Sequence, residues 1–152
     1  MDTKKAITVQ AVINAPVEKV WQLYTAPGHI TQRNYASDDW HTPRAENDLK
    51  PRGKFNYRME AKDGSFGFDF WGIYDKIKTN DLIVYTLGDG RKVMVTFAEK
   101  NNETDIEIKF EAESTHTIEM QRSGWQAILD NFKKYVEDKF GVHWMINYHE
   151  EK

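Results

Sequence analysis

The sequence predicts an α+β domain in which a curved antiparallel sheet of six strands wraps one long C-terminal helix, with two short helices after the first strand. Three observations lead to this fold. Apolar residues alternate in six separate segments, and they recur every three or four positions in one long segment near the C-terminus. Turn-forming pairs such as Asp63-Gly64 separate the strands. A sheet with one apolar face must be covered, and the apolar stripe of the long helix is the available cover.

The length and composition restrict the class of protein. A chain of 152 residues is long enough for one domain, which we assign to residues 1–141, with residues 142–152 as a C-terminal tail. The net charge of −3 comes from acids and bases mixed along the chain, so we expect neither nucleic acid nor a membrane as a partner. The first residues lack the unbroken apolar region of a signal peptide, which favours a cytoplasmic location.

The N-terminal segment predicts a strand and two short helices. Apolar residues at every second position indicate a strand with one buried face over about residues 4–14. Pro16 suits the first turn of a helix that ends near residues 27–28. Residues 29–34 then suggest a second short helix. The segment up to Arg52 shows neither period, and we expect it to be irregular.

Five further strands follow in succession, which predicts a meander. We place them at about residues 54–60, 65–74, 82–87, 93–97 and 104–113. The turns between them are indicated by Asp63-Gly64, Gly88-Asp89-Gly90 and Asn101-Asn102.

The last element is a long helix with one apolar stripe. Gly141 is placed to stop this helix. The stripe consists of Trp125, Ile128 or Leu129, Phe132, Val136 and Phe140.

The strand at residues 65–74 contains five aromatic rings in ten residues. Phe66, Phe68 and Phe70 alternate, and the hairpin places them on the face of Phe55, Tyr57 and Met59, with Trp71 and Ile73 on the other face. Gly67 and Gly72 interrupt this strand, where glycine often marks a bend or bulge. Burial of phenylalanine alone accounts for the stripe as core, and the wall of a ligand cavity is the alternative interpretation.

Several kinds of chemistry are disfavoured. The chain has no cysteine, which removes disulfides and thiolate nucleophiles. Asp63 stands where a nucleophile elbow requires glycine, and Val93 stands where a dinucleotide fingerprint requires its third glycine. The five histidines show no metal-ligand spacing. We therefore expect no metal and no cofactor.

Four segments of the chain resemble, in family order, the activator of heat-shock protein 90 ATPase homologue family of the START-like, helix-grip (SRPBCC, Bet v 1-like) superfamily. They are NAPVEKVWQLYTAPGHITQ, DLKPRGKFNYRMEAKDGSFGFDFWGIYDKI, LIVYTLGDGRKVMVTF and SGWQAILDNFKKYVE. The resemblance implies a hydrophobic cavity between the sheet and the long helix. The superfamily includes lipid and polyketide binders, cyclases and hydrolases. The family is named after the C-terminal domain of a co-chaperone whose N-terminal domain we expect to be absent here.

The leading hypothesis is a binding module for a small apolar or aromatic ligand, acting as a monomer or homodimer. The alternatives are a cyclase-like or hydrolase-like enzyme on a hydrophobic substrate, and a co-chaperone-like module that contacts a chaperone protein. The expected ligand-binding residues are Trp21, Phe55, Tyr57, Met59, Phe68, Phe70, Tyr85, Val95, Phe97, Trp125, Leu129 and Phe132.

The segment YASDDWHTP, residues 35–43, leaves two interpretations open. It is either a surface loop anchored by Trp40 or a gate over the cavity, with Trp40 and His41 touching the ligand. His41 near Asp38 or Asp39 is the weak candidate for a catalytic general base.

Overall fold

The structure, a computed structural model, describes the backbone of residues 5–150 and the side chains of residues 5–140. The strands are β1 (Ala6–Ile13), β2 (Trp40–Asn47), β3 (Lys54–Ala61), β4 (Gly67–Lys78), β5 (Leu82–Leu87), β6 (Lys92–Lys100) and β7 (Glu103–Glu111). The helices are α1 (Val17–Thr25), α2 (Pro27–Arg33) and α3 (Ile118–Glu150).

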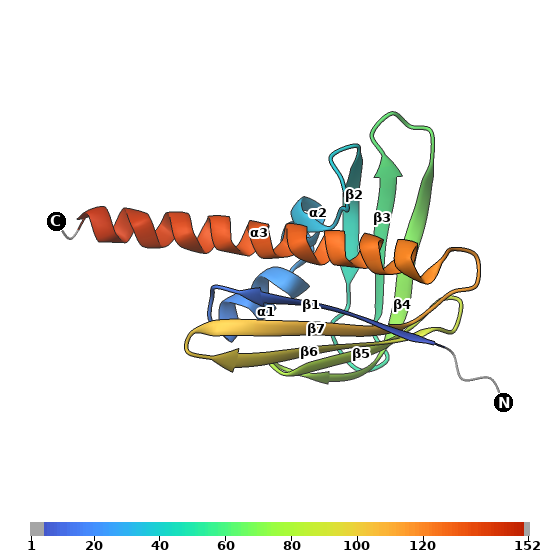
Figure 1. Cartoon of the computed structure of the whole chain (residues 1–152), viewed down its shortest axis with the longest axis horizontal. Helices are drawn as coiled ribbons and strands as arrows, with labels where there is room; N and C mark the ends of the chain where they lie inside the picture. The colour runs from blue at the N-terminus through green and yellow to red at the C-terminus, as the bar shows by residue number, and fades with distance from the viewer. Residues whose placement is uncertain (1–4, 151–152) are drawn as a thin grey trace.

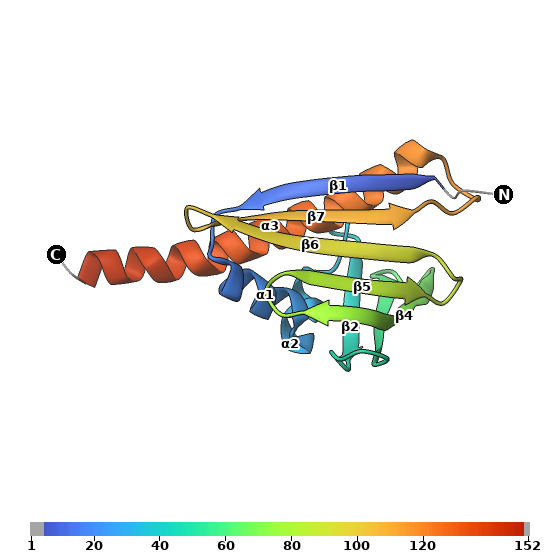
Figure 2. The same cartoon turned by 90° about the horizontal axis from the view of Figure 1, so that it is seen from below.

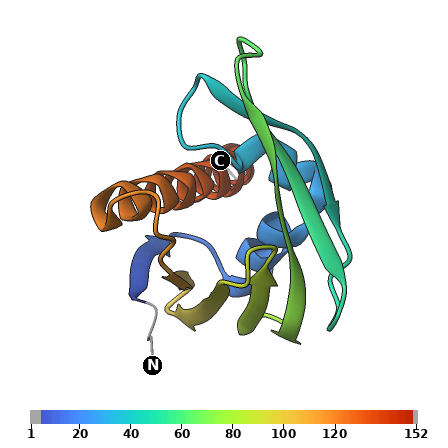
Figure 3. The same ribbon diagram turned by 90° about the vertical axis from the view of Figure 1, so that its right-hand side faces the viewer.

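The strands form one antiparallel sheet in the order β1-β7-β6-β5-β4-β3-β2, and this sheet curls around α3. In Figure 1, β1, β7, β6 and β5 run beneath α3, while β4, β3 and β2 rise beside it. Figure 2 shows the lower strands from below, and Figure 3 looks along α3 into the trough. The predicted α+β helix-grip architecture is therefore confirmed. Among the described residues, no helix has the length and apolar character needed to cross a membrane.

The sheet has seven strands, so the prediction of six was wrong. The additional strand is β2, which starts at Trp40 within the segment expected to be irregular and pairs with β3 from Trp40↔Ala61 to Asn47↔Phe55. Its sequence WHTPRAEN carries no apolar alternation and contains a proline. β2 lies at the edge of the sheet, and Pro43 falls where the pairing register shifts between His41 and Arg44. An edge strand tolerates proline there because no ladder hydrogen bond is lost.

The remaining strands lie where the alternation placed them, because one face of each is buried. In β1 the burial pattern alternates at every residue. The β6–β7 turn has Asn101 and Asn102 at φ 55° and 64°, the left-handed conformation of a two-residue hairpin turn. In β4, the register against β5 shifts between Tyr74 and Lys76, a few residues after Gly72 and not at either glycine.

The helix α3 does not stop at Gly141, contrary to the prediction. It continues to Glu150 and runs past the end of the sheet in Figure 1. Glycine inside a helix costs about 1 kcal/mol relative to alanine but removes no hydrogen bond, so it need not end the helix. Whether side chains of the tail dock on the domain lies outside the described residues.

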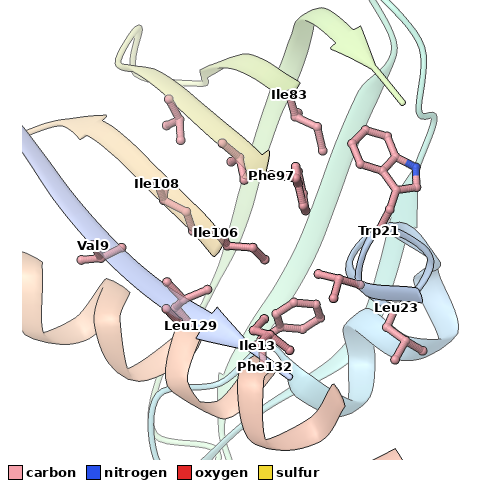
Figure 4. Packing of buried hydrophobic residues seen from close by; sticks show 14 of the residues in the cluster. Val9, Ile13, Trp21, Leu23, Ile83, Phe97, Ile106, Ile108, Leu129 and Phe132 are labelled. Atoms are coloured by element: carbon pink, nitrogen blue, oxygen red, sulfur yellow. The ribbon is translucent and has the colours of Figure 1, made fainter. Parts of the chain in front are cut away.

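The core fills the part of the trough near α1. Figure 4 shows Leu129 and Phe132 of α3 close to Ile13 of β1, with Ile106 and Phe97 on the strands beyond. Trp21 of α1 packs edge-on against Phe97, with ring centroids 5.1 Å apart. This close packing fixes α1 and α3 to the sheet at one end. Toward the other end of α3 the trough is incompletely filled.

Candidate ligand-binding cavity

A cavity of about 400 Å³ lies between the concave face of the sheet and α3. This volume is within the range of small-molecule sites. The segment around α1 and α2 contributes Tyr24, Thr25, Arg33, Asn34 and Ala36. The strands contribute Asn47, Phe55, Tyr57, Met59, Phe68, Phe70, Tyr74, Ile83, Tyr85 and Ile108, and the turn between β5 and β6 contributes Arg91. The segment leading into α3, together with α3 itself, contributes Glu113, His116, Met120, Gln121, Gly124, Trp125, Ile128, Leu129 and Phe132.

The hairpin of β3 and β4 provides the aromatic wall. Its register pairs Met59 with Phe68, Tyr57 with Phe70 and Phe55 with Gly72, so these side chains share one face, as the alternation predicted. The set runs from full burial at Phe55 to 39% exposure at Phe68. The cavity therefore extends from the interior to the molecular surface along this hairpin.

Gly72 makes room for the ring of Phe55. A Cβ atom on Gly72 would lie 2.8 Å from Phe55 Cε2 and 2.7 Å from the carbonyl oxygen of Thr86, both too close for a real contact. The Phe55 ring occupies this space and packs edge-on against Tyr85, with centroids 4.9 Å apart. Glycine in this strand thus permits close packing of the cavity floor.

Trp125 is the principal aromatic residue contributed by α3. Its ring stacks on Phe110 of β7, with centroids 4.0 Å apart and planes 11° from parallel, and it meets Phe70 edge-on at 5.9 Å. Leu129 and Phe132 follow on the same side of α3 and are buried. The spacing of three or four residues thus brings the helical stripe to the cavity.

The buried end of the cavity carries phenol and amide groups. Tyr74 donates its hydroxyl hydrogen bond to Asn47 Oδ1, and Asn47 Nδ2 donates to the Thr25 carbonyl at 2.7 Å. Burial raises the pKa of Tyr57 to about 12, and it also raises the pKa values of Tyr74 and Tyr85. These phenols therefore stay protonated at neutral pH and act as neutral hydrogen-bond groups.

A buried guanidinium lies in the same region. Arg33, the last residue of α2, is 3% exposed and lines the cavity. Its Nη2 donates to the carbonyl of Tyr24 at 2.5 Å, and its carbon Cζ lies 4.5 Å from the Tyr24 ring centroid. This charge offsets part of the burial effect on the pKa values of Tyr57 and Tyr85.

The outer end of the cavity is held by a hydrogen-bonded loop that precedes α3. Gln121 Nε2 donates to the carbonyls of Glu113 and His116, at 3.0 and 2.8 Å. The His116 backbone N–H donates to Glu113 Oε1 at 2.6 Å, which lowers the pKa of Glu113. Met120 beside this loop is 60% exposed. The mouth of the cavity therefore lies between this loop and Phe68.

The structure brings nine of the predicted ligand-binding residues together around the cavity: Phe55, Tyr57, Met59, Phe68, Phe70, Tyr85, Trp125, Leu129 and Phe132. Trp21, Val95 and Phe97 are buried in the packed core instead. Trp40 lies outside the lining and contacts Phe66 and Phe68, with centroids 6.0 and 6.1 Å apart. Whether any of these residues binds a ligand stays a prediction.

His41 lies outside the cavity. It pairs with Glu60 across β2 and β3, on the opposite face from Met59, and its Nε2 is 3.7 Å from Glu60 Oε1. Its carboxylate neighbour is thus Glu60, whereas the sequence suggested Asp38 or Asp39. The segment proposed as a gate, residues 35–43, runs into β2, which begins at Trp40. Of this segment, only Ala36 lines the cavity. This geometry gives His41 no access to a molecule in the cavity.

Sequence reasoning missed the polar lining. Tyr74 could have been found, because it continues the alternation of Phe68, Phe70 and Gly72. Arg33 and Asn47 could not, because their segments show no regular period. Among the described residues, no group of three or more histidine, aspartate or glutamate side chains is placed to hold a metal ion.

Comparisons with known proteins agree with this architecture. A sequence model of the family described as Activator of Hsp90 ATPase homolog 1-like protein matches residues 14–137. The chain is 41% identical to an AHSA1-like protein from Aeromonas hydrophila of known solution structure, with a TM-score of 0.84 and coverage of 89% of this chain and 94% of that chain. A protein from Cytophaga hutchinsonii is 50% identical, with the same coverage and a TM-score of 0.76.

More distant structures share the fold alone. A protein from Chromobacterium violaceum is 20% identical with a TM-score of 0.77, and the match covers 88% of this chain and 98% of that chain. The comparison with curated proteins gives no match.

Proposed function

This chain belongs to the Activator of Hsp90 ATPase homolog 1-like family, and we propose that it is a binding protein for a small apolar or aromatic ligand. The observation that carries the proposal is the cavity of about 400 Å³ with aromatic walls between the sheet and α3. Apolar walls with a few placed polar groups are typical of ligand sites. We further propose that the protein acts in the cytoplasm, as a monomer or homodimer.

The cavity chemistry favours binding over catalysis. Burial raises the pKa values of Tyr57, Tyr74 and Tyr85 away from neutrality, which suits hydrogen bonding and disfavours proton transfer at pH 7. Apolar burial against Phe70 and Trp125 would supply affinity, and the phenol hydroxyls would orient the ligand.

Native mass spectrometry of gently purified protein tests the proposal, because an apolar cavity can retain a ligand from the cell. The mass of the native protein is compared with that of the denatured chain. We expect a reproducible added mass, released on denaturation, and a raised melting temperature when the same compound is added back. A bare chain whose melting temperature no lipid or aromatic compound raises would contradict the proposal.

A second candidate is a co-chaperone-like protein contact, and one observation favours it. Trp40, Phe66 and Phe68 form a ring cluster at the tip of the β3–β4 hairpin, where Phe66 is 60% exposed. Exposed rings of this kind are frequent at protein interfaces. A pull-down of the chaperone that Phe66→Ser abolishes, together with altered ATP hydrolysis, would support it.

A further inference from the structure

Among residues 5–140, Arg33 is the one buried residue with a charged side chain. No carboxylate lies within ion-pair distance of it in this part of the chain. Its two hydrogen bonds go to uncharged groups, the Tyr24 carbonyl at 2.5 Å and Asn34 Oδ1 at 3.4 Å. Its Nε atom finds no hydrogen-bond partner among the side chains and backbone that the structure describes. The guanidinium therefore carries an uncompensated positive charge.

This arrangement is energetically unfavourable without an anion. Removing a charged group from water is strongly unfavourable when no opposite charge compensates it. The rings of Tyr24 and Phe132, with centroids 4.5 and 5.0 Å from the guanidinium carbon, offset only part of this cost by cation–π attraction. A ligand with an opposite charge would compensate this group, because hydrogen bonds between arginine and a carboxylate are charge-assisted and strong.

The position of Arg33 in the cavity indicates where that ligand would bind. Arg33 and Asn34 line the wall near the buried phenols, and the positive charge acts on the pKa values of Tyr24, Tyr57 and Tyr85. Within the described part of the chain, the one acidic residue that lines the cavity is Glu113 at the outer end, where it is paired with His116. The buried end thus carries a positive charge, and much of the remaining wall is aromatic or aliphatic.

We propose that the cavity selects an organic anion, namely a carboxylic acid whose carboxylate lies at Arg33 and whose apolar or aromatic body extends along Phe70 and Trp125 toward the mouth. This inference rests on the proposed binding function and names its ligand class. Tyr57 and Tyr85 line the same cavity, the charge of Arg33 acts on the pKa values of both, and a phenol hydroxyl is a hydrogen-bond donor suited to an anion.

Calorimetric titration with two matched pairs of compounds tests the proposal. The pairs are naphthalene-1-acetic acid with naphthalene-1-acetamide, and decanoic acid with decanamide. The members of a pair have similar shape and differ in charge. At pH 7 we expect at least one acid to bind about ten-fold tighter or more than its amide. Arg33→Met should remove this preference and leave the amide affinity within about three-fold.

Arg58→Met is the matched control, because Arg58 lies outside the cavity lining and its Nε is paired with Glu60 Oε2 at 2.9 Å. This variant should keep the preference for the acid. If Arg33→Met does not fold, titrations of the unaltered protein at a series of pH values test whether it binds the anionic form of the acid. The acid should lose affinity between pH 7 and pH 4 as its carboxyl group is protonated, while the amide affinity stays constant.

Two results would overturn the inference, and they differ in what they mean for the proposed binding function. Equal affinity for acid and amide at pH 7 would make Arg33 a structural link between α1 and α2, and the binding function would stand. Absence of binding by all four compounds, together with a bare chain in the mass spectrum, would overturn the binding function as well.

Discussion

The side chain of Gln126 on α3 makes both hydrogen bonds that a neighbouring strand would make with Gln10 on β1. Gln126 Nε2 donates to the Gln10 carbonyl at 3.0 Å, and the Gln10 N–H donates to Gln126 Oε1 at 3.3 Å. β1 is an edge strand of the sheet. The helix thereby covers backbone groups that would otherwise be free to pair with another chain.

Replacing Gln126 by alanine should therefore loosen the contact between α3 and β1. We expect the free energy of unfolding to fall by about 1 kcal/mol, because two partly exposed hydrogen bonds are lost. Urea unfolding followed by circular dichroism measures this change. Arg122→Ala, at an exposed position on the same helix, should change it by less than about 0.5 kcal/mol. Equal effects of the two variants would show that the carboxamide contributes nothing specific.

The close contact at Gly72 predicts a large effect of a single methyl group. Gly72→Ala would place its Cβ against the Phe55 ring and the Thr86 carbonyl, and overpacking of this kind costs about 1–3 kcal/mol. Gly28→Ala is the control, since a Cβ there meets nothing within 4 Å and alanine favours the helix. Thermal melts should show a lower melting temperature for the first variant and an equal or higher one for the second.

A substitution at Phe68 tests whether this residue acts as cavity wall or as core. Because Phe68 is 39% exposed, Phe68→Ala should lower the free energy of unfolding by only about 1 kcal/mol, and it should weaken ligand binding about ten-fold. Phe66→Ala is the matched control, because Phe66 lies two residues away, just before β4, and outside the lining. Parallel melting and titration experiments measure both quantities. A loss of stability without a loss of binding would assign Phe68 to the core.

The buried phenols predict a loss of stability in alkaline solution. The pKa of Tyr57 is about 12 in the folded protein and about 10 in the unfolded chain, so between these values the folded state holds a proton that the unfolded state has released. The free energy of unfolding should therefore be constant below pH 10 and fall by roughly 2–3 kcal/mol up to pH 12 from Tyr57 alone.

Urea unfolding at a series of pH values between 8 and 12 measures this dependence. Tyr57→Phe should make the decline shallower, while Tyr74 and Tyr85 maintain part of it because burial raises their pKa values too. An identical slope in the variant would contradict the assignment to Tyr57.

Local patterns predicted the sheet and the aromatic wall correctly where one face of a strand is buried. The register of β3 and β4 pairs Tyr57 with Phe70, and the alternation alone had placed both on one face. Trp21 and Phe97 were also predicted at the cavity but lie in the packed core. The distinction between wall and core depends on how far α1 fills the trough, which no local pattern encodes.

The strand β2 and the polar end of the cavity depend on long-range contacts. β2 has no apolar alternation, and its pairing with β3 defines it as a strand. The position of Arg33 depends on the packing of α2 beside β2. This packing brings its guanidinium against the rings of Tyr24 and Phe132. In the sequence, Arg33 stands among polar residues typical of a solvated surface.

The sequence by itself determined the fold class, most strands, the stripe of α3 and the family resemblance, because alternation and helical periodicity record which side of each element is buried. The tertiary structure alone decided that His41 faces away from the cavity, that Trp40 belongs to an edge strand and that the buried guanidinium of Arg33 lines the cavity. The reason is physical. Burial of a face follows from neighbouring residues, whereas the charge and shape of a cavity arise from segments that folding brings together.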